Sequence, residues 1–232
     1  MPLYNLVSTC LEVDENTAKS WLVERYSSAI VKYQDILQPI ILKDNLANKY
    51  IDESILNKYN YYHQYMFDRG LTKEVIRKFK IGYDKETNSL TFPVWDERGG
   101  LIGVTKRQVD TKKFIIPENI DKPIYLLNYI KSEGITKVYV CESQLNALTL
   151  WTWGYPAVAL LGTGSSKQYD ILNRSGIRDY VLCFDGDEAG YKGRNRFIKN
   201  IKNDVLISSK RIPQDKDVND LSKEEFDNLE IF

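Results

Sequence analysis

Two aspartates separated by one glycine follow an apolar stretch in the C-terminal half of the chain. The run FDGDEAGYK comes directly after Tyr180–Cys183, which has the pattern of a buried strand. Alternate side chains of an extended segment point the same way, so Asp185 and Asp187 can both reach one metal ion. We expect Gly186 to let a phosphate or a metal-bound water approach the backbone, and Gly190 to allow a tight entry into the next helix. An isolated surface turn can have the same composition, so a metal site is indicated only if a further acidic residue accompanies the two aspartates.

That residue is Glu142, which follows another short apolar stretch at 136–141. Between the two acidic positions the sequence alternates in character, with a helix at 144–153, a strand at 157–161, a helix at 166–175 and a strand at 180–184. This alternation predicts a parallel sheet with right-handed crossovers, extended by a further strand near 205–208. The carboxyl ends of parallel strands share one edge, so Glu142, the Gly-Thr-Gly loop at 162–164 and the two aspartates are expected to converge there.

These motifs resemble the Toprim domain of DnaG-type primases, topoisomerases and related nucleases. The segment VLCFDGDEAGYKGRNRF is closest to the primase form and includes Arg194 in the following helix. Upstream, residues 69–84 and 90–130 resemble the opening and the strand-rich continuation of the primase RNA-polymerase core. The resemblance covers about residues 65–222. It implies an α/β fold, with a Toprim parallel-sheet domain preceded by a mixed α/β basic subdomain and an N-terminal helical segment.

The resemblance implies a DNA-directed RNA polymerase that synthesises short RNA primers on single-stranded DNA by metal-dependent nucleotidyl transfer. It assigns Glu142, Asp185 and Asp187 to catalysis, and the same three residues with Asp217 to metal binding. Mg²⁺ is the expected cofactor, with Mn²⁺ as a substitute. Ribonucleoside triphosphates are the expected substrates, and a replicative helicase is an expected partner. Two alternatives are a Toprim nuclease and a Toprim module that binds nucleic acid without catalysis.

The basic residues are unevenly distributed although the formal net charge is zero. Five basic residues stand against one acidic residue between positions 98 and 113, and five against two between 68 and 80. Strand alternation puts Arg107 and Lys113 on one side of an antiparallel segment, as expected of a groove that neutralises phosphates. By resemblance, the residues that bind nucleic acid or nucleotide are Arg69, Arg98, Arg107 and Lys113.

Two asparagines depart from the family pattern. Asn146 stands where the family has the aspartate of Glu-Gly-x-x-Asp, and Asn219 makes a similar exchange two residues after Asp217. Without the family, Asp217 and Asn219 resemble turn and helix-cap residues. Because each exchange removes a negative charge, we expect a functional site that binds its cations weakly.

The chain lacks the residues of a zinc module. It has no Cys-x-x-Cys pair and a single histidine, His63, so we expect no zinc here and a zinc-binding module in cis or in trans. His63 lies in the aromatic run at 59–65, which helical spacing assigns to the core, with base stacking as the alternative. Cys141 and Cys183 fall in predicted strands and are expected to be reduced core thiols.

The sequence shows no secretion signal and no run of about 18 apolar residues, so we expect no membrane association and a location in the cytoplasm of a bacterium or a bacteriophage-infected cell. The predicted organisation is an N-terminal helical segment with a cap near Asp14, a basic α/β subdomain, the Toprim domain and an acidic C-terminal tail, at 1–60, 61–133, 134–209 and 210–232.

Overall fold

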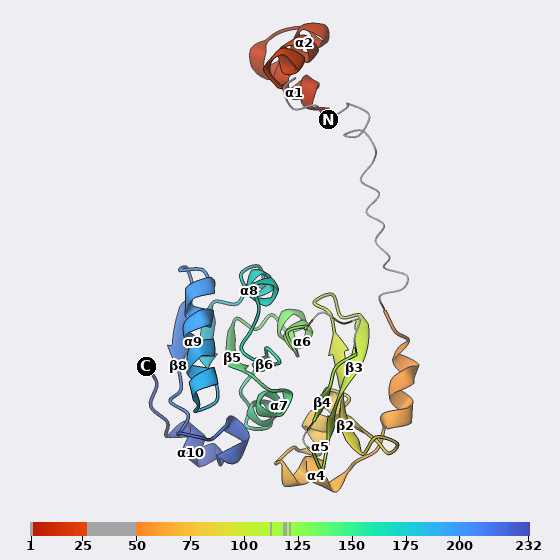
Figure 1. Ribbon diagram of the computed structural model, residues 1–232, viewed down its shortest axis with the longest axis vertical. Helices are drawn as coiled ribbons and strands as arrows, with labels where there is room; N and C mark the ends of the chain where they lie inside the picture. Colours follow the sequence, from red (N-terminus) through yellow and green to blue (C-terminus); the bar gives the residue numbers. More distant parts are fainter. Residues whose placement is uncertain (1, 27–49, 112, 118–119, 121) are drawn as a thin grey trace. The chain divides into compact units, whose positions relative to one another are not determined.

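Two four-stranded sheets organise most of the chain (Figure 1). The computed structural model describes residues 2–26, 50–111, 113–117, 120 and 122–232. The chain divides into two compact units, residues 1–46 and residues 47–232. The finer division predicted at residues 60, 133 and 209 stays a prediction.

The first unit contains two contacting helices, α1 (Leu3–Leu11) and α2 (Glu15–Tyr26). The Asp14 carboxylate accepts hydrogen bonds from the backbone N–H groups of Asn16 (2.9 Å) and Thr17 (3.0 Å). The predicted cap is therefore confirmed, since these N–H groups have no partner within the helix.

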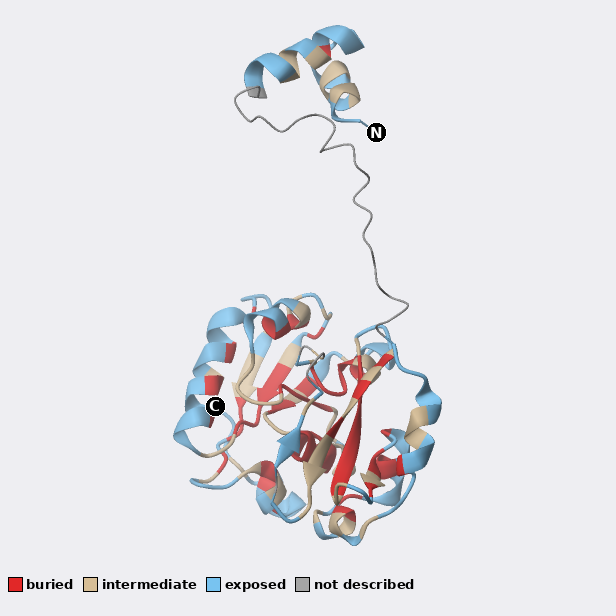
Figure 2. Ribbon diagram, turned by 45° about the vertical axis from the view of Figure 1, so that its right-hand side comes forward, coloured by how far each residue is buried: buried red, intermediate tan, exposed pale blue. Residues whose placement is uncertain are grey.

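The second unit begins with a short 3₁₀ helix, η2 (Glu53–Tyr59), and two short helices, α4 (Gln64–Asp68) and α5 (Lys73–Lys78). An antiparallel sheet of order β1-β2-β3-β4 follows, with strands Gly82–Asp84, Ser89–Trp95, Leu101–Gln108 and Phe114–Ile115. All seven residues of β2 are buried (Figure 2). Alternate residues of β3 are buried from Leu101 to Thr105, because one face of this strand packs on the core and the other is more open.

The second sheet is parallel throughout and has the order β6-β5-β7-β8. Its strands in chain order are Lys137–Cys141, Ala157–Ala159, Asp179–Leu182 and Leu206–Ser209. Helix α6 (Leu127–Ser132) precedes β5, and the crossover helices α7, α8 and α9 span Gln144–Thr152, Ser166–Leu172 and Glu188–Asn200. The predicted order of strands and helices is confirmed.

Apolar side chains cover both faces of the parallel sheet. Along β7, Val181 faces a core that includes Cys141, whereas Tyr180 and Leu182 face a core that includes Phe197 of α9. Cys141 and Cys183 are buried free thiols, as predicted. Burial on both faces is what makes the strands of a parallel sheet continuously apolar.

One core joins the two sheets. It contains Phe79 from α5, Phe92 from β2 and Leu145 from α7, so α7 lies between the sheets (Figure 1). A buried hydrogen bond of 2.9 Å from Gln144 Nε2 to Thr105 Oγ1 connects α7 with β3. The antiparallel and the parallel sheet therefore share one apolar interior.

The segment after β8 is folded and packed into this core. It forms the 3₁₀ turn η3 (Val218–Asp220) and helix α10 (Lys223–Asp227). Phe226 is 1% exposed, and the ammonium group of Lys210 donates hydrogen bonds to the carbonyl oxygens of residues 226, 227 and 229 at 2.9–3.1 Å. The segment we expected to be an acidic tail is thus part of the folded unit.

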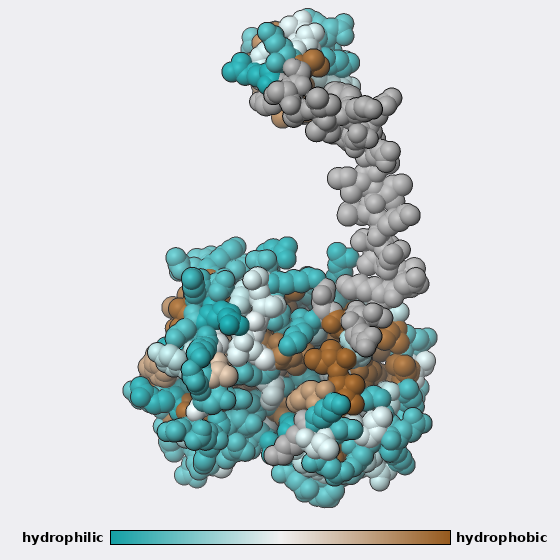
Figure 3. All heavy atoms as spheres, viewed as in Figure 1, coloured by the Kyte–Doolittle hydropathy of each residue, from teal (hydrophilic) through white to brown (hydrophobic). Residues whose placement is uncertain are grey.

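The surface over α8, α9 and α10 is mostly hydrophilic, and apolar side chains gather nearer to β3 and α6 in the same view (Figure 3). Among the described helices, none is long and apolar enough to cross a membrane.

Candidate active site

The acidic residues meet at the carboxyl edge of the parallel sheet. Strands β5 and β7 are neighbours, with Val140 opposite Leu182, so Glu142 and Asp185 leave the sheet on the same side. The Glu142 carboxylate accepts a hydrogen bond from the Asp185 N–H at 3.3 Å. The convergence predicted from strand order is therefore present in the fold.

Asp187 occupies the cap of α9. Its Oδ1 accepts a hydrogen bond of 2.7 Å from the Gly190 N–H, so this carboxylate lies at the positive end of a 13-residue helix. A Cβ on Gly190 would lie 2.1 Å from the Asp185 carbonyl oxygen, which confirms the tight entry expected there.

Gly186 has a different neighbour from the one we expected. Its N–H donates to the Lys216 carbonyl oxygen (2.9 Å), and its own carbonyl oxygen accepts from the Asp215 N–H (3.0 Å). A Cβ at this position would lie 1.9 Å from the Pro213 carbonyl oxygen. The C-terminal backbone thus fills the space that we assigned to a phosphate or a metal-bound water, and this pairing brings Asp217 to the site.

The pKa values of the carboxyl groups show that these groups repel one another. Burial raises the pKa of Asp185 to about 7, and the negative charges of Glu142, Asp217 and Asp187 contribute to the rise. Burial raises the pKa of Glu142, and the negative charge of Asp187 raises it further by a smaller amount. Burial and the neighbouring Asp220 raise the pKa of Asp217, whereas Arg69 lowers it. A bound cation would relieve this repulsion.

The donor set fits a hard divalent cation, because it consists of carboxylate oxygens that are partly buried and mutually repelling. Within the described residues, however, no three acidic, histidine or cysteine side chains converge closely enough to form a metal cage. The suitable donor set and the absence of a closed cage are compatible, because two of the carboxylates already accept hydrogen bonds from the backbone. Asp187 and Asp217 each accept a backbone N–H at Oδ1 as a helix cap, so one oxygen of each carboxylate is already engaged by the protein.

The two asparagines that depart from the family pattern contact each other. Asn146 is fully buried, donates from Nδ2 to Asp185 Oδ1 (3.2 Å) and accepts at Oδ1 from the Asn219 N–H (3.3 Å). The Asn219 amide donates to Thr149 Oγ1 (2.6 Å) and to the Arg69 carbonyl oxygen (2.8 Å). Asn146 therefore orients Asp185, and Asn219 ties the C-terminal segment to α7 and to the end of α4.

Two of the predicted basic residues lie beside this acidic cluster. Burial lowers the pKa of Arg107, Arg69 lowers it further, and Tyr65 and Asp217 act in the opposite direction, so the four groups are neighbours. The Nε atoms of both arginines and the Tyr65 hydroxyl are buried without a hydrogen-bond partner in the described part of the chain. Buried donors of this kind need an acceptor, and paired guanidinium groups favour an anion. Tyr65 was not predicted, since nothing in its local sequence separates it from its aromatic neighbours.

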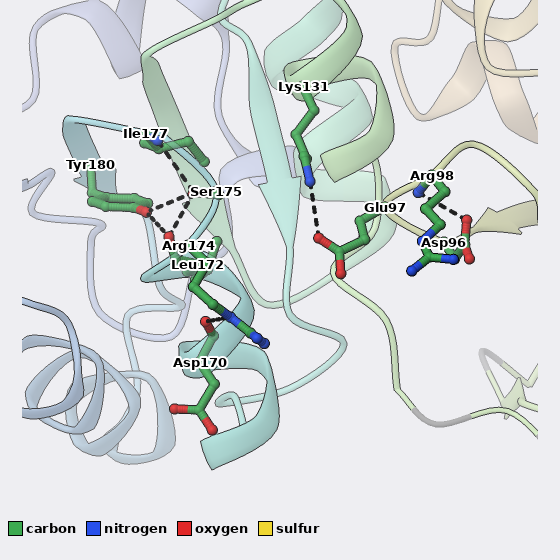
Figure 4. Close-up of polar contacts among 10 residues, drawn as sticks. All are labelled: Asp96, Glu97, Arg98, Lys131, Asp170, Leu172, Arg174, Ser175, Ile177 and Tyr180. Atoms are coloured by element: carbon green, nitrogen blue, oxygen red, sulfur yellow. Dashed lines mark hydrogen bonds and ion pairs between the residues drawn. The ribbon is translucent and has the colours of Figure 1, made fainter. Parts of the chain in front are cut away.

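Arg98 does not join them. It lies in the turn between β2 and β3, at the opposite end of the hairpin from Arg107, where its N–H donates to Asp96 Oδ1 (Figure 4). Lys113 is exposed in the β3–β4 turn, and its carbonyl oxygen accepts from the Gln108 N–H. It therefore lies at the Arg107 end of the sheet.

Arg194 also faces away from the carboxylates. Its Nε donates to Ser209 Oγ (2.8 Å), and its guanidinium lies 4.5 Å from the centre of the Phe232 ring. These contacts connect α9 with β8 and the C-terminal residues of the folded unit.

A cavity of about 330 Å³ opens beside Glu142. Its wall is mostly apolar and comes from both sheets, because it includes Phe114 and Ile116 on one side and Leu161 and Gly162 on the other. Lys122 adds a positive charge at this wall. The cavity is therefore an apolar recess with acidic and basic groups at its margin.

Comparison with known proteins agrees with this geometry. Residues 139–222 match the family model described as Toprim-like. DNA primase from Campylobacter jejuni is 28% identical over 212 residues, covering 66% of this chain and 35% of the relative, and DNA primase from Enterococcus faecalis is 24% identical over 278 residues, covering 94% and 42%. The chain thus spans less than half the length of these relatives.

Solved primase cores share the fold. The DnaG primase catalytic domain bound to single-stranded DNA superposes with a TM-score of 0.63 at 21% identity, covering 74% of this chain and 73% of that one. The Escherichia coli primase catalytic core gives a TM-score of 0.59 at 22% identity, covering 79% and 76%. Residues 139–222 therefore form a Toprim-like domain, and the chain is similar in sequence to DNA primases and in fold to DnaG catalytic cores.

Proposed function

We propose that this chain is the RNA-polymerase core of a DnaG-type primase, a nucleotidyltransferase that synthesises short RNA primers on single-stranded DNA. The observation that carries the proposal is the position of Arg69 and Arg107 next to the acidic cluster around Asp185, with buried Nε donors that have no hydrogen-bond partner among the described residues. A triphosphate is the substrate that needs both an arginine pair and cation-binding carboxylates.

Each residue has a distinct part in this arrangement. Arg69 and Arg107 bind and orient the phosphates of the incoming ribonucleotide, since guanidinium groups match phosphate geometry. Glu142, Asp185, Asp187 and Asp217 hold divalent cations, Mg²⁺ by default and Mn²⁺ as a substitute. When bound, these ions would neutralise phosphate charge and activate the primer-end hydroxyl. Asn146 keeps Asp185 in place through its 3.2 Å hydrogen bond.

Basic residues outside this cluster would guide the template. Lys113 is exposed at the Arg107 end of the antiparallel sheet, where a phosphate backbone can reach it. Arg98 lies at the far end of the same hairpin. It would therefore contact a part of the template that is distant from Arg107.

The partners of the proposed reaction follow from its relatives. One related structure holds single-stranded DNA, one from Aquifex aeolicus contains zinc-binding and RNA-polymerase domains, and one is the primase fragment of the bacteriophage T7 primase-helicase. We therefore propose single-stranded DNA and ribonucleoside triphosphates as ligands of this chain. A zinc-binding module and a replicative helicase would act with it in cis or in trans, in the cytoplasm.

The test is a primer-synthesis assay with single-stranded templates, labelled ribonucleotides and Mg²⁺ or Mn²⁺. We expect short RNA products from the wild-type chain and none from Asp185→Ala. Glu188→Ala is the matched control, because this acidic residue lies three positions after Asp185, at the start of α9, but directs its carboxylate to solvent, where it pairs with Lys192. Template degradation would instead identify a nuclease, and binding without either reaction would identify an inert Toprim module. Several templates are needed, since this chain carries no zinc module to select one.

A further inference from the structure

The aromatic run before α4 is only partly buried. Tyr59 is 7% exposed and belongs to the core, but Tyr61 and Tyr62 are 48% and 38% exposed. The expectation that the whole run is core is therefore wrong for these two residues. Within the described residues, His63 takes part in no metal cluster and instead caps α4, because its Nδ1 accepts the Tyr65 N–H at 3.2 Å.

Three of these rings form a row. The His63 and Tyr83 rings stack with centroids 4.2 Å apart, and the centroid of the Tyr61 ring lies 5.8 Å from that of Tyr83, with the two planes tilted by 42°. The row is held against the β1 strand, since a Cβ on Gly82 would lie 2.2 Å from the Tyr59 carbonyl oxygen. Such a row offers planar aromatic surface at low entropic cost, because its rings are already ordered.

A cavity adjoins the exposed tyrosines. Its volume is about 240 Å³, it has Tyr61 and Tyr62 among its lining residues, and Ile76 and Ile81 add apolar side chains. This volume is below the range of about 300–1,000 Å³ that is typical for drug-sized ligands, so the cavity suits a single ring system.

Three cations surround the aromatic residues and form no salt bridge in the described part of the chain, although Glu74 acts on Arg77 through its charge. Lys58 lies over the Tyr59 ring (4.7 Å) and Lys85 over the Tyr61 ring (4.4 Å), while Arg77 donates from Nε to the Tyr62 hydroxyl (2.9 Å). All three are exposed. Cations held by rings rather than by acids can turn to a phosphate without breaking an ion pair.

We propose that this surface, formed by Tyr61, Tyr62, Tyr83, Lys58, Arg77 and Lys85, binds single-stranded nucleic acid without base selectivity. Bases stack on the tyrosines, and the three cations contact the phosphates between them, which is how sequence-tolerant single-strand sites work. His63, next to this surface, caps the N-terminal end of α4, and Arg69 caps its C-terminal end, so one short helix separates the surface from the arginine beside the carboxylate cluster. We assign the bound strand as the template. The identity of the strand as template rests on the proposed function, whereas the binding surface does not.

The test is fluorescence anisotropy with a labelled oligo(dT) of about ten nucleotides, in the absence of divalent cations and nucleotides. We expect Tyr61→Ala and Tyr62→Ala each to weaken binding by about fivefold or more, since one lost stack is worth at least that factor. Tyr61→Phe, which keeps the ring, binds as the wild type does. Tyr191→Ala is the matched control, because Tyr191 is a 63% exposed tyrosine on α9, outside the proposed surface.

The proposal is overturned if Tyr61→Ala and Tyr62→Ala bind oligo(dT) as tightly as the wild type, with folding verified by thermal melting. Lys85→Gln separately reduces the slope of log affinity against log salt by about 0.7, and an unchanged slope removes Lys85 from the surface. An oligo(U) probe identifies the strand: tighter binding of oligo(U) assigns the surface to the RNA product, and equal or weaker binding to the DNA template. These readouts need no catalysis, so absence of primer synthesis would refute the proposed function and leave this one intact.

Discussion

Replacing Gly186 by alanine tests how the C-terminal segment reaches the carboxylates. The added Cβ would lie 1.9 Å from the Pro213 carbonyl oxygen, 2.7 Å from the Pro213 carbonyl carbon and 3.0 Å from the Ile212 carbonyl oxygen. All three are backbone atoms, so no side-chain rotation relieves the clash. The backbone at 212–216 must move away, and the two hydrogen bonds between this segment and Gly186 are strained or lost.

The expected cost follows from these contacts. Overpacking and the loss of backbone hydrogen bonds together lower the free energy of unfolding by about 2–4 kcal/mol. Because the same movement displaces Asp217 from Asp185, primer synthesis falls by roughly a hundredfold for each ångström of displacement. Urea unfolding followed by circular dichroism measures the first effect, and the primer-synthesis assay measures the second.

Gly134→Ala is the control for this experiment. A Cβ at Gly134 meets nothing within 4 Å, but the residue has φ of 64°. Its substitution therefore carries only the conformational cost of a left-handed residue, about 1 kcal/mol, and leaves primer synthesis unchanged. If Gly186→Ala were no less stable than Gly134→Ala and equally active, the close approach of the C-terminal backbone to Gly186 would not be what positions Asp217.

Three further outcomes are expected. Burial and the neighbouring acidic residues raise the pKa of Asp185 to about 7, from 3.8 in the unfolded chain. Between these two pH values the folded metal-free protein keeps a proton that the unfolded chain has lost. Its free energy of unfolding, measured with urea in a chelator, should fall as pH rises from about 4 to about 7 and level off above, and a fall equally large in Asp185→Asn would contradict this origin. Asn146→Asp replaces the hydrogen-bond donor to Asp185 with a carboxylate that repels it. The variant should be less stable than the wild type without metal, yet it should need a lower Mg²⁺ concentration for primer synthesis. An unchanged Mg²⁺ requirement would show that Asn146 does not weaken cation binding. Arg107→Gln should raise the KM for ribonucleotides about tenfold or more, because a charge-assisted hydrogen bond to phosphate is lost. Arg211→Gln is the control and should leave the KM unchanged, because Arg211 is exposed and pairs with Glu230. Equal KM values for the two variants would exclude Arg107 from nucleotide binding.

The sheet and its acidic edge could be predicted because their signals are local. Each strand is a short apolar run and each crossover is an amphipathic stretch, and the parallel direction of the strands then brings the carboxyl ends of β5 and β7 to one edge. Glu142 and Asp185 follow directly from that order. The fate of Gly186 could not be predicted in this way, because its neighbour is backbone from 27 positions later in the chain.

Among the basic residues, too, some positions follow from local sequence and others depend on the folded arrangement. Along β3, Arg107 shares a face with Thr105, whereas Lys106 lies on the other face and pairs with Asp84 at 2.6 Å. Arg98 is equally basic and equally close in sequence, but it lies in the turn, and the length of the hairpin carries it away from the carboxylates. The aromatic run misled for a related reason: helical spacing assumes a helix, and residues 60–63 precede α4 rather than belong to it.

The hydrogen bond from Asn219 to the Arg69 carbonyl oxygen joins residues 150 positions apart. During synthesis on the ribosome, the α4 end of this contact emerges long before its partner does. A nascent chain that ends at the start of α9 already has Asp185, but it lacks the segment that supplies Asp217 and connects α7 to α4. The proposed nucleotide site is therefore complete only when residues 212–219 have been translated.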